Sequence, residues 1–243
     1  MNKVIVITGG TSGIGKYLTE QYIKLGNKVY IISKNIKKIE KVKEEINNKY
    51  AIFINADLTK EKAIKQAFEK IYNMEEHIDI LINNAAYDNM QPIENFEYEE
   101  FQKIINTNLL GKVFCIKYAI PLLRKSMYPS IINIASRLSE KPMINSSAYC
   151  CGASSIVMLT KCAALELEKY SIRVNCISPS LTLTPLSIKS YTKEEIENVS
   201  NKSTRKRLCT PEDIFELINF LSSEKSDYIN GENIGLNGGI LLK

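Results

Sequence analysis

The chain has 243 residues, a formal net charge of +5 and a hydrophobic fraction of 44%, with 24% charged residues. These values are typical of a soluble globular protein of one or two domains, large enough to need no disulfide framework. The densest basic run, Arg205-Lys206-Arg207, is only three residues long, so we expect no nucleic-acid binding.

The six cysteines include no C-x-x-C pair and lie mostly in apolar runs, a pattern typical of reduced thiols in the cytoplasm. The N-terminal apolar run, 4–7, is too short for the core of a signal peptide, and no stretch approaches eighteen apolar residues. We therefore expect a cytoplasmic protein with no membrane span. His77, the single histidine, lies where a helix ends, so we predict neither a metal site nor a Ser-His-Asp triad.

Short apolar, β-branched runs alternate with longer helical patterns along the chain. The predicted strands are 4–7, 29–32, 51–54, 78–82, 131–134, 172–177 and 233–236. The predicted helices include 13–25, 36–47, 60–73, 109–123 and 148–170. Runs that are apolar throughout indicate strands buried on both faces, as in a parallel sheet. The alternation predicts an α/β fold, with one Rossmann-type domain over 1–243: a doubly wound parallel sheet of about seven strands with helices on both faces.

One stretch, 178–210, departs from this alternation. It is polar, carries a helical pattern at 192–200, and ends where Thr210 as N-cap, Pro211 and two acidic residues predict a new helix. A long polar insertion at the carboxyl edge of such a sheet predicts a substrate lid, 180–207, and a solvated surface loop is the alternative. We interpret its basic residues as solvated charges, with Arg207 pinning the loop; attraction of an anionic substrate or acidic carrier protein is the alternative for Lys202, Arg205, Lys206 and Arg207.

The first predicted strand leads directly into Thr8-Gly9-Gly10-Thr11-Ser12-Gly13-Ile14-Gly15, and a helix follows. Glycines let the backbone turn sharply and approach a pyrophosphate with no Cβ in the way, and the helix N-terminus offers free N–H groups to the phosphates. This placement between strand and helix predicts a dinucleotide site. Its predicted contacts are Gly9, Thr11, Ser12, Gly13, Ile14 and Gly15.

The pattern T-G-x-x-x-G-I-G is similar to the fingerprint of the short-chain dehydrogenase/reductases, and further motifs follow in that family's order. Asp57-Leu58-Thr59 resembles the acidic stretch that faces the adenine ring, and Asn83-Asn84-Ala85-Ala86 resembles N-N-A-G with Ala86 in place of glycine. The run 175–180 resembles N-x-I-x-P-G, again without its last glycine. The resemblance implies cofactor contacts at Asp57, Leu58, Asn84, Ala85, Ala86, Pro179 and Thr184.

The end of the second predicted strand bears on which dinucleotide binds. An acidic residue there would hydrogen-bond the ribose 2′-hydroxyl and repel a 2′-phosphate. The sequence has Ser33 and Lys34 instead, a hydroxyl and a cation. We therefore predict that these two residues bind the cofactor and that NADP(H) is preferred over NAD(H).

The resemblance also implies the catalytic residues. Ser136 would polarise a substrate carbonyl, Tyr149, thirteen residues later, would transfer the proton, and Asn108 is the family's active-site asparagine. The expected Y-x-x-x-K, however, reads Tyr149-Cys150-Cys151-Gly152-Ala153, so Ala153 stands at the lysine position.

The effect of losing this lysine on the tyrosine pKa and on turnover can be estimated. A cation about 4 Å from a phenol, at an effective dielectric constant of about 20, is worth ~4 kcal/mol, or about three pKa units. In the family's mechanism the lysine also holds the nicotinamide ribose. We expect turnover ~10²–10⁴ lower than in an intact relative.

Three interpretations of Ala153 stay open. The chain is an active reductase whose lysine was deliberately replaced, a natural variant with slow or altered chemistry, or a nucleotide-binding pseudoenzyme that acts through partners. The prediction is an NAD(P)(H)-dependent oxidoreductase that interconverts a carbonyl and an alcohol on a small substrate, such as a 3-oxoacyl group. The pseudoenzyme, or a non-redox or partner-binding role, is the alternative.

The substrate pocket is expected to draw on Arg137, Leu138, Met143 and the lid. The predicted helix 148–170 is apolar over more than one stripe, which is typical of a helix buried on two sides. One side would face the sheet and the other a second subunit. We therefore predict a homodimer or homotetramer, with a small carbonyl or alcohol as the other binding partner.

Overall fold

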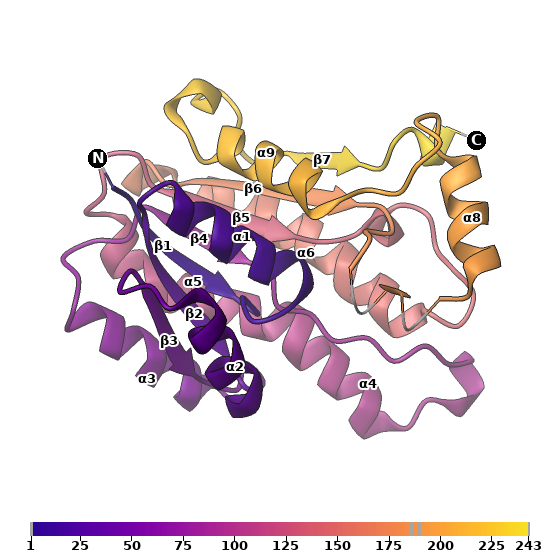
Figure 1. The fold of residues 1–243 in the computed structure, drawn as a ribbon, viewed down its shortest axis with the longest axis horizontal. Coiled ribbons are helices and arrows are strands. Elements are labelled where there is room, and N and C mark those ends of the chain that lie inside the picture. The colour runs from indigo at the N-terminus through magenta and orange to yellow at the C-terminus, as the bar shows by residue number, and fades with distance from the viewer. Residues whose placement is uncertain (1, 185–186, 189–190, 243) are drawn as a thin grey trace.

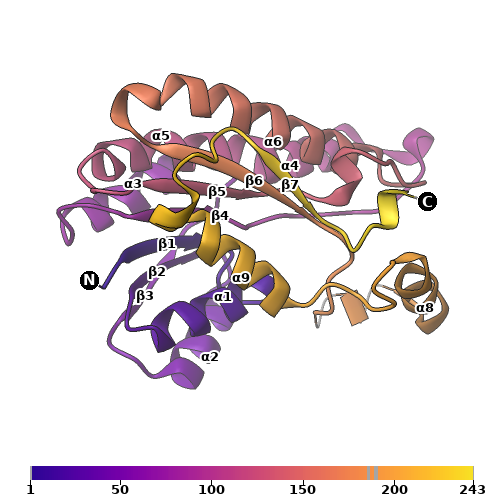
Figure 2. The same cartoon turned by 90° about the horizontal axis from the view of Figure 1, so that it is seen from above.

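The computed structural model describes residues 2–184, 187–188 and 191–242. It is built on a seven-stranded sheet with the order β3-β2-β1-β4-β5-β6-β7, in which every neighbouring pair is parallel (Figures 1 and 2). The strands are β1 (Val4–Thr8), β2 (Lys28–Ser33), β3 (Ala51–Asn55), β4 (Ile80–Asn83), β5 (Ser130–Ile134), β6 (Arg173–Pro179) and β7 (Asn233–Leu236). The strand order reverses between β1 and β4, as in Rossmann folds. The predicted α/β fold is confirmed.

Helices cover both faces of the sheet. One face carries α1 (Gly13–Lys24), α2 (Ile36–Ile46) and α9 (Pro211–Leu221). The other carries α3 (Glu61–Tyr72), α5 (Gly111–Leu123) and α6 (Ser147–Glu166), with α4 (Tyr98–Ile105) packed beside α6 (Figure 2). The doubly wound arrangement explains why the strands are apolar throughout.

The side chains of the first strand contribute alternately to the hydrophobic cores on the two faces of the sheet. Successive side chains of a strand point to opposite faces. Val4 and Val6 enter the core under α3, α5 and α6, whereas Ile5 and Ile7 enter the core under α1 and α9. All are buried, so a polar residue at any of these positions would lose hydrophobic burial worth roughly 1.5–3 kcal/mol.

Two predicted helices have different bounds in the structure. The helix expected at 109–123 begins at Gly111 and continues backwards through a π-helical turn, η2 (Asn106–Leu110), into α4. Helix α4 was not predicted, because Ile104 is its only fully buried residue and its apolar pattern is short. The helix expected at 148–170 ends at Glu166 and is followed by a 3-10 turn, η4 (Glu168–Tyr170).

By length and composition alone, α6 could cross a membrane; among the described residues it is the single such helix, with 39% of its most apolar window buried. In the fold it packs against α4, β5 and β6. A core helix can satisfy the same criterion, which makes it weak evidence. The absence of a membrane span stays a prediction.

The C-terminal third contains two helices whose N-termini are capped by threonine side chains. Helix α8 (Lys193–Lys202) begins after Thr192, and α9 begins after Thr210, each with a reciprocal capping box. The predicted start of a helix at Thr210 is confirmed. Within the predicted lid, residues 185–186 and 189–190 lie outside the described residues.

Candidate active site

The loop between β1 and α1 is packed backbone against backbone. Gly9 has a φ of +70°, and a Cβ there would lie 3.0 Å from the Cα of Ala85. A Cβ on Gly15 would lie 2.4 Å from the carbonyl oxygen of Gly9. Ser12, the N-cap of α1, makes no side-chain cap, so the first N–H groups of the helix are free to bind an anion. The structure thus places the predicted pyrophosphate contacts in one tight turn at the N-terminus of α1.

The N-N-A-A segment after β4 is tied to this loop. The Asn84 side chain donates a hydrogen bond to the Thr8 carbonyl oxygen at 2.9 Å. The Thr8 hydroxyl accepts from the backbone N–H groups of Asn84 and Ala85, both at 3.0 Å. Ala86 follows on the exposed side. These bonds place the predicted contacts Asn84, Ala85 and Ala86 beside the glycine loop.

The end of β2 lies on the other side of the same loop. The hydroxyls of Thr11 and Ser33 are 2.9 Å apart and share a hydrogen bond. Lys34 is exposed, and its Nζ lies 5.9 Å from the centre of the Tyr87 ring. The structure thus brings Thr11, Ser33 and Lys34 together, with no carboxylate among the three.

Asp57 follows β3 and is held in an Asx turn. Its carboxylate accepts hydrogen bonds from the Thr59 backbone N–H at 3.0 Å and from the Thr59 hydroxyl at 2.9 Å. Burial opposes its ionisation, but the Thr59 bonds and the charge of Lys34 outweigh it, and the pKa of Asp57 is lowered. Leu58 next to it packs on Gly111, at the start of α5.

Asn108 lies in the π-helical turn η2 and is 2% exposed. Its Oδ1 accepts from the Tyr87 backbone N–H at 2.8 Å, and its Nδ2 donates to the Tyr87 carbonyl oxygen at 2.9 Å. Both polar atoms are therefore engaged with one peptide segment. The side chain fixes the chain directly after the N-N-A-A segment.

Ser136 and Tyr149 face each other across the carboxyl end of β5. Ser136 is the N-cap of the 3-10 turn η3 (Arg137–Ser139), and its Oγ accepts from the Leu138 backbone N–H at 3.2 Å. Burial, and secondarily the charge of Asp88, raises the pKa of Tyr149 to about 12, although a hydrogen bond with Ser136 acts in the opposite direction. The structure brings the predicted serine and phenol together.

Ala153 lies one turn after Tyr149 on α6 and is buried. The preceding residue, Gly152, faces Asn108: a Cβ there would lie 3.4 Å from the Asn108 Cβ. The groups that shift the pKa of Tyr149 are Asp88, Ser136, Tyr191 and Cys150, and none of these described neighbours is a lysine. The phenol consequently keeps a high pKa.

Two groups near the phenol were not predicted from the sequence. Asp88 follows the N-N-A-A segment and Tyr191 comes from the predicted lid. Burial, and secondarily the Asp88 charge, raises the pKa of both Tyr191 and Tyr149. Desolvation also raises the pKa of Asp88 itself, although its side chain is exposed. No motif marks either residue, because only the fold brings 88, 149 and 191 to one edge.

The described part of the lid begins over the glycine loop. Pro179 ends β6, and the Thr184 methyl group lies 3.5 Å from where a Cβ of Gly13 would be. The Thr184 backbone N–H donates to the Ser187 hydroxyl at 2.9 Å. The structure therefore places Thr184 close to the predicted pyrophosphate cradle, and Pro179 at the end of β6, paired with Leu236.

The far end of the lid is fixed to α9. Arg207 binds Asp213 through two hydrogen bonds of 2.6 and 2.8 Å, which hold the pKa of that carboxyl well below its usual range. The prediction that Arg207 pins the loop is confirmed. Lys206 donates to the Asn201 carbonyl oxygen at 2.8 Å and is exposed.

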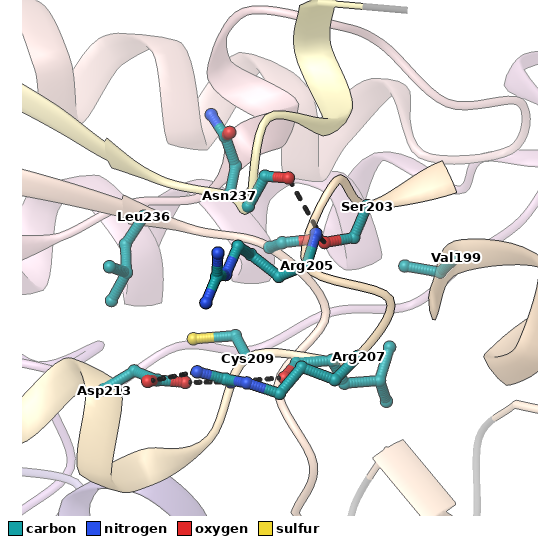
Figure 3. A pocket seen from close by; sticks show the side chains of 11 residues that line it. Val199, Ser203, Arg205, Arg207, Cys209, Asp213, Leu236 and Asn237 are labelled. Atoms are coloured by element: carbon teal, nitrogen blue, oxygen red, sulfur yellow. Dashed lines mark hydrogen bonds and ion pairs between the residues drawn. The ribbon is translucent and has the colours of Figure 1, made fainter. Parts of the chain in front are cut away.

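A pocket of about 120 Å³ lies between the lid and β7 (Figure 3). Arg205, Arg207, Asp213 and Asn237 line it, but neither Ser136 nor Tyr149 does. A second pocket, of about 230 Å³, is lined by Arg137, Lys141, Val199, Lys202 and Ile240. Of the predicted pocket residues, Arg137 thus lines an opening, whereas Leu138 is buried and Met143 is partly exposed.

Comparisons with known proteins show which family the chain is similar to. The family model of the short chain dehydrogenases matches residues 3–195. The 3-oxoacyl-[acyl-carrier-protein] reductase FabG of Aquifex aeolicus is 29% identical over 242 residues, which cover 98% of this chain and 97% of that protein.

Two similar solved structures carry a nicotinamide cofactor. The 3-ketoacyl-(acyl-carrier-protein) reductase of Brucella melitensis, complexed with NADH, is 30% identical with a TM-score of 0.89 and 98% coverage of both chains. ElxO with NADP bound is 29% identical with a TM-score of 0.92 and full coverage of both chains. Together with the match of the family model, the glycine loop and the strand order, these likenesses identify the chain as a member of the short-chain dehydrogenase/reductase family of oxidoreductases.

Proposed function

We propose that the protein is an NADP(H)-dependent oxidoreductase that interconverts a carbonyl and an alcohol on a small substrate. The observation that carries the proposal is the placement of Ser136 and Tyr149 at the same sheet edge as the glycine loop. At Gly9 and Gly15 an added Cβ would collide with neighbouring atoms of the protein, so only glycines allow this tight turn in front of the N-terminus of α1, which supports diphosphate binding there. The reduced cofactor, when bound, supplies the hydride.

The chain's own residues would bind and protonate the substrate. The Ser136 hydroxyl hydrogen-bonds the carbonyl oxygen, and the Tyr149 phenol gives that oxygen its proton. Reduction needs the protonated phenol, and Tyr149 is protonated at neutral pH, although its raised pKa also makes it a weak proton donor. Oxidation of the alcohol needs the phenolate and is therefore the slower direction near pH 7.

A carbonyl panel with NADPH tests the proposed activity, with 3-oxoacyl thioesters included because FabG of Aquifex aeolicus is a relative. The matched control is Tyr149→Phe, which keeps the ring and removes the proton. Loss of NADPH oxidation in this variant, with NADPH still bound in calorimetry, is expected. Failure of the wild-type protein to bind either nicotinamide cofactor would refute the proposal.

A second candidate function follows from Ala153. Without the lysine, the chain binds the dinucleotide but turns over slowly or acts through partners. NADPH binding with no consumption on the whole panel, at any pH, is the result that would favour this pseudoenzyme.

Cofactor preference is expected to reside in Lys34. The change Lys34→Glu places a negative charge where a 2′-phosphate would bind, and loss of one charge-assisted contact should weaken NADPH binding by roughly 10–100-fold. NADH affinity should change little or improve. Fluorescence titration with both cofactors measures this, and Lys43→Glu on the exposed end of α2 controls for net charge. Equal effects of the two substitutions would contradict the prediction.

We further propose that residues 180–207 form the substrate lid of a single-domain protein. Two observations support this: Thr184 lies beside Gly13 at one end, and the Arg207–Asp213 pair holds the other end to α9. Tyr191 lies between those ends and near Tyr149, as their shared response to the Asp88 charge indicates.

A homo-oligomer is expected to form through α6. Its outward side chains Met158 and Leu165 are 59% and 77% exposed in the isolated chain, and exposed apolar patches mark interaction surfaces. Leu165→Glu should convert a dimer or tetramer to smaller species in light scattering. Leu25→Glu, at the end of α1, changes a similarly exposed leucine and should leave the mass unchanged. A monomeric wild-type mass would refute the prediction.

A further inference from the structure

Apart from Ser136 and Tyr149, the fold contains a buried lysine close to the proposed cofactor site. Lys112, in the first turn of α5, is 2% exposed. Its Nζ donates hydrogen bonds to the carbonyl oxygens of Asn83 at 2.7 Å and Ala85 at 3.0 Å. Both acceptors belong to the N-N-A-A segment, in which Asn84, Ala85 and Ala86 are the predicted cofactor contacts.

A fully buried lysine without a carboxylate partner is costly, and such residues are rare. The titratable groups that act on Lys112 are two neutral thiols, Cys115 on α5 and Cys176 on β6, and burial raises the pKa of each to about 12. Burial lowers the pKa of Lys112 itself to about 8. An apolar residue could be buried at this position at a lower cost in free energy, as Cys115, Ile116 and Ala119 are elsewhere on the helix.

The polar contacts of Lys112 continue to the helix that carries Tyr149. The Asn83 side chain donates to the Asn133 Oδ1 at 2.9 Å, and the Asn133 side chain donates to the Thr160 hydroxyl at 3.0 Å. Thr160 lies two turns after Ala153 on α6, and both side chains are buried. The chain of bonds therefore joins α5, β4, β5 and α6 beneath the site.

One polar atom in this chain lacks a partner. The Oδ1 of Asn83 is buried and makes no hydrogen bond within the described residues. An ammonium has three hydrogens, and the hydrogen bonds of Lys112 to Asn83 and Ala85 use two of them. Within the described residues, one N–H of Lys112 and one side-chain oxygen of Asn83 thus have no hydrogen-bond partner, at the segment where the dinucleotide is proposed to bind.

We propose that Lys112 is a positioning residue for the cofactor, providing from α5 the cation that Ala153 cannot provide from α6. This inference rests on the proposed function. Lys112 orders the backbone of Asn83 and Ala85 and places a positive charge beneath the bound dinucleotide. Lys112 does not lower the pKa of the phenol as the family's lysine does, because it is not among the groups that shift the pKa of Tyr149.

Proton uptake gives a direct test on the unaltered protein. An anionic cofactor stabilises the protonated amine, so binding at pH 8.5 should take up roughly half a proton if the pKa of Lys112 rises from about 8 by about one unit. Calorimetry of NADPH binding in two buffers of different ionisation enthalpy measures this number. Lys112→Met, which keeps the length and removes the charge, should abolish the uptake and weaken NADPH binding about tenfold.

Stability against pH provides the structural control. Because the folded-state pKa of Lys112 lies below its unfolded value, the unfolded chain binds more protons between pH 8 and 10.5. This group therefore makes the cofactor-free protein more stable as pH rises through that window, and Lys112→Met should remove its contribution. If that variant fails to fold, Lys112→Arg, which keeps the charge, should retain NADPH affinity. Proton uptake by the wild-type protein on binding NADPH then still tests the role of Lys112.

These experiments distinguish failure of the proposed function from failure of the proposed role of Lys112. If the wild-type chain binds no nicotinamide cofactor, the proposed function fails. If it binds NADPH with no proton uptake at pH 8.5, or if Lys112→Met binds NADPH as tightly and with the same uptake, only the role of Lys112 is overturned. A lowered melting temperature alone, with both binding readouts unchanged, also overturns it.

Discussion

The substitution Ala153→Lys should raise NADPH-dependent carbonyl reduction by ~10²–10⁴, the usual weight of acid–base assistance. A cation about 4 Å from the Tyr149 phenol would lower its pKa by about three units from the present value near 12. Ala153 lies one turn from the phenol and faces the interior, so a lysine there can reach the phenol. Steady-state turnover of the best carbonyl substrate measures the gain.

The pH profile separates this effect from simple packing. Alcohol oxidation by the wild-type chain should still be rising above pH 10, whereas in Ala153→Lys its midpoint should move down toward neutrality. Ala153→Met is the control, because it fills similar volume without charge. If neither the turnover nor the midpoint of the pH profile differs between the two variants, the chain is not a reductase disabled at this position. That result would favour the nucleotide-binding pseudoenzyme.

Gly15→Ala should abolish nicotinamide cofactor binding, with a loss of at least ~10²-fold in affinity. Its Cβ would lie 2.4 Å from the Gly9 carbonyl oxygen, a distance that forces backbone apart because neither partner is a flexible side chain. The first N–H groups of α1 would then move away from the diphosphate. Calorimetry with NADPH measures the loss, and circular dichroism checks that the fold survives.

A glycine outside the loop provides the matched control. Gly235 lies on β7, has no positive φ, and an added Cβ there meets the flexible Asn237 side chain at 2.8 Å. Gly235→Ala should therefore leave cofactor affinity within about twofold of wild type. Intact NADPH binding by Gly15→Ala would show that the cofactor does not bind at this loop.

Sequence reasoning predicted best where the backbone itself carries the constraint. The glycine loop, the apolar strands and the cap at Thr210 were all found, because glycine, alternation and capping chemistry are local properties. The placement of Ser136 and Tyr149 came from spacing that resembles a known family. Each of these features can be recognised within about fifteen residues of sequence.

The rest depended on contacts between distant segments. Lys112 looks like a solvated charge in sequence, and only the fold shows that it is buried beneath Asn83. Asn108 bonds to the backbone of Tyr87, and a backbone partner leaves no trace in residue types. Helix α4 was missed because its buried face reduces to Ile104.

The π-helical turn at Asn106–Leu110 determines which way the two halves of a long helical rod face. A π turn holds one residue more than an α turn, so removing a single residue there would give a continuous α-helix and rotate everything before it by about 100° relative to α5. Asn108 could then no longer bind Tyr87 while Lys112 binds the N-N-A-A segment that precedes it. The π-helical turn therefore allows the side-chain amide of Asn108 and the ammonium of Lys112, on one continuous helical segment, to bind the same stretch of chain after β4.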